Sequence, residues 1–164
     1  MTPTDLIVAP TGLRFLGRHF PCTWGKGGIT GDKREGDGAT PRGNHRIVGM
    51  LYRPDRMARP TSWAEPILPG DLWSDASGDA QYNQWVRAPY THSHQSLPPA
   101  APLFDLVFLN YWNWPAPTPG KGSAIFIHRW RRPGYPTEGC VALRPDHLLW
   151  IAQRLAPTSR LIVP

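Results

Sequence analysis

The chain of 164 residues lacks several features that define common protein classes. It has no apolar run of membrane-spanning length, no heptad pattern and no internal repeat of about 20 to 50 residues. We therefore expect a soluble protein rather than a membrane-spanning helix, a coiled coil or a repeat array. Charged residues are also scarce, at 18% of the chain, while 20 prolines and 16 glycines interrupt helices. This composition argues against a helical bundle and favours short strands joined by turns.

The chain does contain enough apolar sequence for one core. Hydrophobic residues make up 40% of it and include eight tryptophans, which argues against disorder. The length falls in the range of a single domain that can bury a core. We therefore predict one mainly β domain over residues 1–164.

Apolar and alternating runs predict the strands of this domain. The turn signal Thr11-Gly12 predicts an N-terminal hairpin. One helix is predicted from Pro145, because proline suits a first helical position and apolar residues from Leu148 to Leu155 repeat at helical spacing before Pro157. The predicted strands are 5–9, 13–17, 19–24, 45–52, 84–88, 104–110, 123–128, 139–143 and 160–163.

A proline-rich stretch over residues 53–102 has few long apolar runs. We predict that it is an irregular excursion that folds over the sheet as a cap or lid, as long loops in compact domains often do. Trp73, Asp75, Tyr82, Asn83 and Trp85 are its candidates for substrate contact. The alternative is that these side chains pack the excursion itself, because aromatic residues in loops are often anchors.

Two segments in the C-terminal third carry the strongest chemical signal. An apolar run ends in His128, and after a short basic loop Cys140 follows directly on Gly139. A thiol is a strong nucleophile as thiolate, and a nearby imidazole lowers the cysteine pKa towards neutral. Gly139 permits a tight turn, which lets the backbone N–H groups of residues 139 and 140 face an oxyanion. The pattern predicts a cysteine nucleophile with a histidine base.

Two other interpretations of these residues stay open. A free cysteine is often a buried small hydrophobe without a chemical role. His19 and Cys22 lie three residues apart, and with His128 and Cys140 they would offer four zinc ligands. The spacing lacks a paired-cysteine pattern, so we expect no metal and no cofactor. A disulfide between Cys22 and Cys140 would remove the nucleophile, and we expect none.

A further segment extends the pattern. Residues 36–43 (Gly-Asp-Gly-Ala-Thr-Pro-Arg-Gly) precede the alternating run 45–48. With His128 and residues 137–141 (Thr-Glu-Gly-Cys-Val), this segment resembles the L,D-transpeptidase catalytic-domain (YkuD-like) family of bacterial cell-wall enzymes. In that family a Thr-Pro-x-Gly element enters a strand, a later strand carries the catalytic histidine, and a Ser/Thr-His-Gly-Cys-Ile/Val element carries the nucleophile. The matching residues here are Thr40, Pro41, Gly43, His128, Thr137, Gly139, Cys140 and Val141.

The resemblance implies an L,D-transpeptidase-like β-sandwich or sheet with one or two short helices and a long capping loop. It implies that Cys140 attacks a peptidoglycan stem-peptide carbonyl at a bond from an L-centre to a D-residue, and that His128 moves the proton. The side-chain amine of a diaminopimelate on a second stem would then accept the acyl group. With water as acceptor, the protein would be a carboxypeptidase or endopeptidase. The remaining alternative is a non-catalytic peptidoglycan-binding domain.

Three departures from the family pattern bear on substrate choice. Glu138 stands where the family has a second histidine, Ala142 stands where it has Arg or Asn, and the interval from His128 to Cys140 is shorter. A lost donor at position 142 and a carboxylate at 138 would change how acidic stem groups are held. Thr137 and Glu138 are predicted to contact substrate. We predict 1,3 links from the first L-alanine to diaminopimelate, with 3,3 links as the alternative.

Positive charge gathers beside the predicted base. The net charge is +6, and residues 129–132 (Arg-Trp-Arg-Arg) form a basic patch. Arg129 is predicted to attract the carboxylates of stem peptides. The alternatives are a solvated loop and nucleic-acid binding, for which no motif is present. We expect peptidoglycan stem peptides as partners, no nucleic acid and a monomer.

The N-terminal residues 1–10 have no positively charged start and only four apolar residues together, which does not fit a secretory signal peptide. Peptidoglycan cross-linking takes place outside the cytoplasmic membrane, so the resemblance predicts the periplasm or the cell wall. Three explanations stay open: a signal removed before the first residue, another export route, or a cytoplasmic precursor or recycled muropeptide as substrate.

Overall fold

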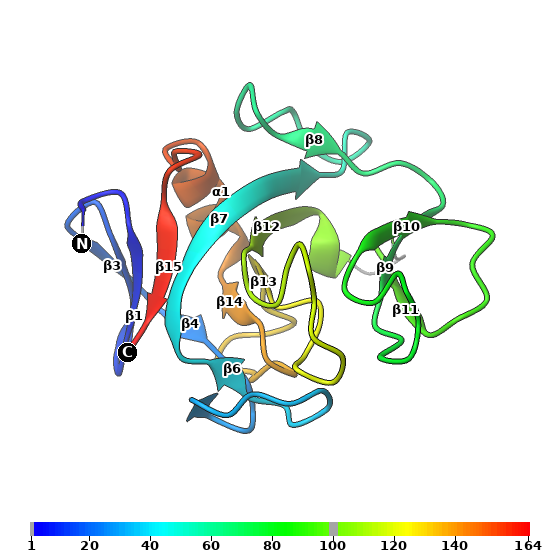
Figure 1. The fold of residues 1–164 in the computed structure, drawn as a ribbon. Coiled ribbons are helices and arrows are strands. Elements are labelled where there is room, and N and C mark those ends of the chain that lie inside the picture. Colours follow the sequence, from blue (N-terminus) through cyan, green and yellow to red (C-terminus); the bar gives the residue numbers. More distant parts are fainter. Residues whose placement is uncertain (1, 99–101) are drawn as a thin grey trace.

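A computed structural model describes residues 2–98 and 102–164. Its main sheet consists of β1 (Leu6–Ala9), β2 (Gly12–Phe15), β3 (Arg18–Phe20), β4 (Cys22–Thr23), β7 (Gly43–Tyr52), β8 (Glu65–Pro66), β12 (Leu106–Asn110), β13 (Phe126–Arg129), β14 (Val141–Leu143) and β15 (Arg160–Val163). Hydrogen bonds order these strands β3-β2-β1-β15-β7-β12-β13-β14-β4, and β8 pairs with β7. Figure 1 shows β7 as a long curved strand. Because β4 returns to contact β2, the sheet is nearly closed.

One side of the sheet packs against the helix α1 (Pro145–Ala152). Leu148, Ile151 and Ala152 of the helix are buried in one cluster with Phe108 of β12 and Ile127 of β13. Alternation along the strands places their other residues on the opposite side. There a second cluster forms, whose members include Leu51, Trp73, Leu97, Phe104, Val107, Leu109 and Phe126. β12 and β13 are therefore covered on both faces.

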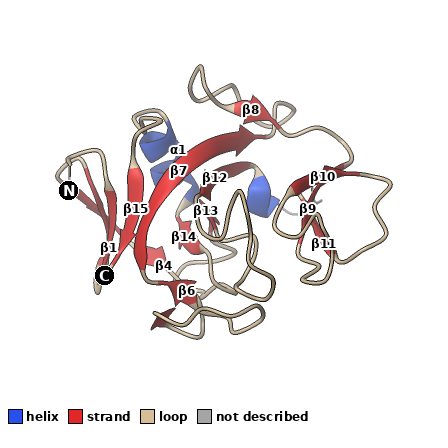
Figure 2. Cartoon of the chain, in the orientation of Figure 1, coloured by secondary structure: helices blue, strands red, loops and turns tan. Residues whose placement is uncertain are grey.

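The excursion over residues 53–102 covers the second cluster. It contains a small antiparallel sheet of its own, made by β9 (Asp71–Ser74), β10 (Trp85–Arg87) and β11 (His94–Ser96) in the order β10-β9-β11. Trp73 packs edge-on against Phe126 of the main sheet, with ring centroids 5.0 Å apart. Figure 2 shows long loops between these short strands. The sequence predicts β10 but not β9 or β11, and residues 99–101 lie outside the described part of the chain.

The remaining short elements bring the chain to the site. β5 (Ile29–Thr30) and β6 (Thr40–Pro41) pair in parallel, and the 3₁₀ helix η1 (Pro102–Phe104) precedes β12. The predicted mainly β fold and the helix from Pro145 are confirmed. The predicted strand 19–24 is divided into β3 and β4 at Pro21, which has no N–H for a ladder. Among the described residues, no helix is long and apolar enough to cross a membrane.

Candidate active site

The pairing of β13 with β14 brings the two predicted catalytic side chains to one face. These strands are parallel, with His128 opposite Ala142. Paired residues of parallel strands point to the same side, and side chains alternate along each strand. Cys140 lies two positions before Ala142, so it shares the face of His128. This is the face of the second cluster, where Cys140 packs against buried apolar side chains.

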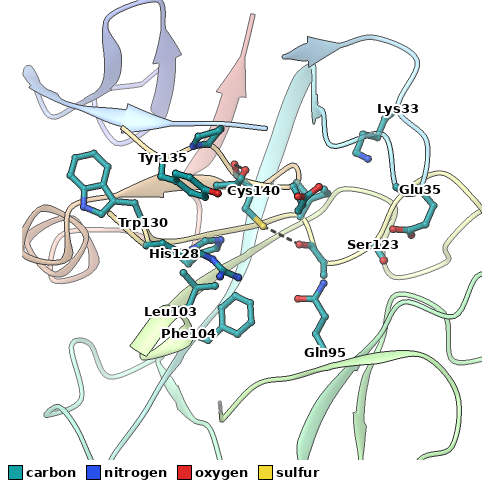
Figure 3. A pocket seen from close by; sticks show the side chains of 17 residues that line it. Lys33, Glu35, Gln95, Leu103, Phe104, Ser123, His128, Trp130, Tyr135 and Cys140 are labelled. Atoms are coloured by element: carbon teal, nitrogen blue, oxygen red, sulfur yellow. Dashed lines mark hydrogen bonds between the residues drawn. The ribbon is translucent and has the colours of Figure 1, made fainter. Parts of the chain in front are cut away.

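Cys140 is fixed by the backbone of the segment that leads into β13. Its Sγ donates a hydrogen bond to the carbonyl oxygen of Ala124 at 3.2 Å and accepts one from the N–H of Phe126 at 3.3 Å. Figure 3 shows the bond from Sγ to the carbonyl oxygen as a dashed line. Ala124 has a φ of +51°, which interrupts the strand predicted over 123–128 and directs its carbonyl to the thiol. The Cys140 side chain is therefore a thiol with two backbone partners.

His128 is buried, with 5% of its surface exposed. Its Nδ1 lies 2.7 Å from the carbonyl oxygen of Arg129. A carbonyl only accepts hydrogen bonds, so Nδ1 carries the proton and Nε2 keeps its lone pair. The ring of Phe104 meets the imidazole at 89°, with centroids 5.4 Å apart, and helps to fix it. His128 is thus held in the tautomer that can accept a proton at Nε2.

Burial decides the resting protonation of both groups. Desolvation raises the pKa of Cys140 to about 11, although the Phe126 N–H and the charge of Lys33 act in the opposite direction. Desolvation also lowers the pKa of His128 to about 4. At neutral pH the free protein therefore holds a thiol beside a neutral imidazole. This differs from the near-neutral thiolate expected from the sequence, because both side chains are removed from water.

The turn before the nucleophile requires glycine. Gly139 has a φ of +141°, and a Cβ at this position would lie 2.9 Å from the carbonyl oxygen of Ala39. Thr40 Oγ1 donates to the Gly139 carbonyl at 2.7 Å and accepts from the N–H of Gly25 at 2.9 Å. Thr40 of the Thr-Pro-x-Gly element therefore fixes the peptide next to Cys140.

Thr137 closes the same turn from the other side. Its Oγ1 donates to the carbonyl oxygen of Cys140 at 2.5 Å and accepts from the N–H of Gly139 at 3.1 Å. One of the two N–H groups predicted to face an oxyanion is therefore bonded to Thr137 in this structure. The peptide groups on both sides of Cys140 are therefore hydrogen-bonded in this structure.

A cavity of about 610 Å³ opens in front of Cys140 and His128. Its walls come from the strand ends, the loop before the nucleophile, the turn near residue 35, the excursion and η1 (Figure 3). The lining residues are Lys33, Glu35, Gly36, Gln95, Leu103, Phe104, Ser123, Ala124, Ile125, His128, Trp130, Arg131, Tyr135, Pro136, Thr137, Glu138 and Cys140. Four predicted site residues, Cys140, His128, Thr137 and Glu138, thus meet in one cavity.

The cavity wall contains charges that differ in burial. The Lys33 side chain is 2% exposed, and its Nζ donates to Asp37 Oδ1 and to the carbonyl oxygen of Arg34, both at 2.6 Å. Glu35 accepts a hydrogen bond from Tyr82 Oη at 2.5 Å. Glu138 is instead 76% exposed and pairs with Lys26 at 2.8 Å. One side of the cavity therefore has a fixed buried cation, and the rim has an exposed carboxylate.

The other predicted substrate contacts, Arg129, Tyr82, Asn83 and Asp75, are not among the described residues that line this cavity. Asn83 Oδ1 accepts from the N–H of Ala124 at 3.0 Å, so it fixes the turn under the thiol. Tyr82 Oη accepts from the N–H of Gly122 at 3.0 Å.

Arg129 orients His128 through its carbonyl, and its neighbour Arg131 lines the cavity instead. Asp75 accepts from Ser93 Oγ at 2.5 Å within the excursion. Arg129 and Asp75 therefore do not form the cavity surface. Tyr82 and Asn83, through their bonds to Gly122 and Ala124, support the wall from behind.

Several polar residues of the cavity are not predicted from the sequence, among them Lys33, Glu35, Gln95 and Ser123. Ser123 Oγ is buried and has no hydrogen-bond partner among the residues that the structure describes. The only sequence signal for Lys33 and Glu35 is a charged run directly before the Gly-Ala-Thr-Pro segment. Such a run is normally a solvated loop, and burial of Lys33 depends on contacts with distant parts of the chain.

The alternative zinc set is not assembled. Within residues 2–98 and 102–164, no group of three or more His, Cys, Asp and Glu side chains is placed to hold a metal ion. His19 Nε2 instead lies 3.0 Å from Thr11 Oγ1. Cys22 and Cys140 are both free thiols.

A family model described as the L,D-transpeptidase catalytic domain matches residues 13–163. The match contains every element of the site, from the Thr-Pro-x-Gly segment to the strand after Cys140. No curated protein and no solved structure gives a significant match.

Proposed function

The chain belongs to the L,D-transpeptidase catalytic-domain family, and from that premise we propose that it is a cysteine acyltransferase acting on peptidoglycan stem peptides. The observation that carries the proposal is the placement of Cys140 and His128 on one face of β13 and β14, in one cavity. A peptidoglycan-binding domain without catalysis would need neither the thiol nor the oriented imidazole.

The first half of the reaction acylates Cys140. Sγ forms a bond to the carbonyl carbon of the donor stem while its proton passes to His128 Nε2, because neither group is charged at rest. The backbone N–H of Cys140 stabilises the oxyanion, joined by that of Gly139 when Thr137 releases it. The C–N bond then breaks, His128 returns the proton to the leaving amine, and a thioester remains.

The second half transfers the acyl group to an amine. The side-chain amine of a diaminopimelate on another stem attacks the thioester carbonyl carbon. The new C–N bond forms, the C–S bond breaks, and His128 conveys a proton from the amine to Sγ. The thiol is regenerated, and water in place of the amine would give the hydrolytic reaction of a carboxypeptidase or endopeptidase.

The donor bond we propose is the one from the first L-alanine to D-glutamate, which would give 1,3 links. Ala142 is fully buried and opposite His128, so no long polar side chain extends from that position toward a stem carboxylate. Glu138 at the rim disfavours acidic groups near it. A 3,3 link, formed with loss of D-alanine, is the alternative product.

We further propose that the protein works as a monomer in the periplasm or cell wall, where cross-linked peptidoglycan is made. Family membership supports that location. Thr137 and Glu138 contact the substrate from the cavity wall, whereas Tyr82 and Asn83 keep that wall in place. The excursion over 53–102 contributes Gln95 to the cavity and serves as its cap.

The experiment that tests this function uses purified protein and defined disaccharide tetrapeptides, with products read by tandem mass spectrometry. Dimers with an L-alanine-to-diaminopimelate bond, together with a released peptide that begins with D-glutamate, support 1,3 transfer. Loss of D-alanine alone with a diaminopimelate-to-diaminopimelate bond supports 3,3 transfer and contradicts the donor assignment. Monomeric cleavage products alone indicate hydrolysis. The absence of any product contradicts the proposal that the protein is an enzyme.

A further inference from the structure

Glu138 offers the cavity an accessible carboxylate close to the nucleophile. It lies two residues before Cys140 and lines the same cavity. The other acid on that wall, Glu35, already accepts the hydroxyl of Tyr82. Glu138 is 76% exposed, and its resolved partner is the ammonium group of Lys26 at 2.8 Å. A cation that enters the cavity from solvent therefore meets the carboxylate of Glu138 at the rim next to the thiol.

The group that pairs with Glu138 in this structure resembles the amine of an acyl acceptor. Lys26 Nζ is a primary ammonium group at the end of an alkyl chain, which is the same chemical group as the side-chain amine of an acyl acceptor. The lysine side chain is 59% exposed. Exposed ion pairs contribute little to stability, so another ammonium group can replace this one at small cost. Lys26 is also anchored by its own backbone, since its N–H donates to the carbonyl oxygen of Thr137 at 2.8 Å.

We infer that Glu138 is the acceptor-binding residue: it recruits the ammonium group of the second stem in place of Lys26 and holds it beside the thioester on Cys140. The inference rests on the acyl transfer proposed above and assigns the selectivity of its second half. It explains how an amine can compete with water in an open cavity, because the carboxylate raises the local concentration of cationic acceptors.

The amine must lose its positive charge before it attacks. The acceptor arrives as R–NH₃⁺ on Glu138 and releases one proton to solvent. The neutral amine then forms the C–N bond as the C–S bond breaks, and its second proton reaches Sγ through His128. Glu138 therefore acts as a positioning residue for the acceptor in the second half of the reaction.

The test compares Glu138→Gln with the unaltered enzyme at saturating donor while the acceptor is varied. Two acceptors are used: a diaminopimelate tetrapeptide, whose amine is cationic at neutral pH, and hydroxylamine, which is uncharged there. We expect the KM for the tetrapeptide to rise about fivefold or more, with more hydrolysis per transfer. The ratio of transfer to hydroxylamine over hydrolysis should stay within about twofold, because neither hydroxylamine nor water carries a charge there.

The matched control is Lys26→Met, which removes the competing ammonium group and keeps the backbone bond to Thr137. Its KM for the tetrapeptide should fall or stay the same. An equal rise in both variants would overturn the inference, because the ion pair itself would then be what the site needs. An unchanged KM in Glu138→Gln, or equal losses with both acceptors, would also overturn it. If the unaltered enzyme releases no leaving group, the acyltransferase proposal fails instead.

Discussion

The main sheet brings two free cysteines onto neighbouring strands in different surroundings. Cys22 lies on β4 opposite Leu143, and burial raises its pKa to about 12. Cys140 lies directly before β14, and burial raises its pKa to about 11 while the Phe126 N–H and Lys33 oppose the shift. Both residues are half-buried. Partial burial therefore does not by itself distinguish them.

The two thiols differ in the polar groups that surround them. Cys140 has a backbone donor, a backbone acceptor, a buried cation in the same cavity and an oriented imidazole on the paired strand. Burial alone gives an inert thiol. A reactive one also needs a base placed to take its proton during attack, and His128 shares the cavity of Cys140.

The largest expected difference between the two cysteines appears when each thiol is removed in turn. Cys140→Ala should lower turnover of a muropeptide donor by about 10⁴-fold or more, because it removes the thiol proposed to form the thioester. Cys22→Ala should retain most of the activity, since its side chain has no part in the cavity. Initial rates from mass spectrometry measure both. Substantial activity in the Cys140→Ala protein would reverse the assignment of the two regions.

Removing the base tests the second difference between them. His128→Ala should reduce turnover by about 10²- to 10⁴-fold, the usual contribution of general acid–base catalysis. His19→Ala is the matched control, because this exposed histidine next to β4 contacts Thr11 and not the cavity. Steady-state rates of donor cleavage decide the matter. Similar rates for the two variants would show that the imidazole beside Cys140 is not the base.

The turn that presents Cys140 can be strained without changing its chemistry. Gly139→Ala places a methyl group 2.9 Å from the Ala39 carbonyl at a φ of +141°. It should lower the free energy of unfolding by about 1–3 kcal/mol and slow turnover at least about tenfold through a displaced thiol. Gly31→Ala is the control, since nothing lies within 4 Å of its added Cβ. Denaturant unfolding compares the two, and equal stabilities would contradict the predicted strain.

The smallest expected effect comes from the positive charge of Lys33, which lowers the pKa of Cys140. Below pH 11 the thiolate fraction of Cys140 rises with pH, so its alkylation by iodoacetamide should accelerate through pH 8–10 without a plateau. Lys33→Met should raise the pKa of Cys140 further and slow alkylation about two- to fivefold at a fixed pH. Cys22 in the same samples serves as one control. Lys121→Met is the other, because the exposed Lys121 side chain pairs with Asp32 and is not among the described residues that line the cavity. A plateau reached by pH 8 would mean that Cys140 is a thiolate at rest.

The sequence predicts the parts of the site that depend on short-range pattern. The apolar run before His128, the glycine before Cys140 and the proline at the start of α1 each act within a few residues, so their signals are local. The sequence misses the positive φ of Ala124, because it depends on Asn83, which lies 41 residues away and accepts the Ala124 N–H.

Long-range contacts account for the remaining differences. Thr40 acts on the Gly139 carbonyl across 99 residues, so its motif match alone does not reveal its role. The burial of Lys33 and the resting protonation of Cys140 likewise depend on which segments cover them. A thiolate expected from a neighbouring histidine becomes a thiol once both side chains lose their water.

The acyl-enzyme is detected most directly from the intact mass of the protein after brief reaction with a tetrapeptide donor in the absence of amine acceptor. Acid quenching preserves a thioester, and peptide mapping then locates it. We predict an added donor acyl group on the peptide that contains Cys140, absent from the Cys140→Ala protein and never found on Cys22. Donor consumption with an adduct on Cys22, or with turnover that persists in Cys140→Ala, would show that Cys140 does not carry the acyl group.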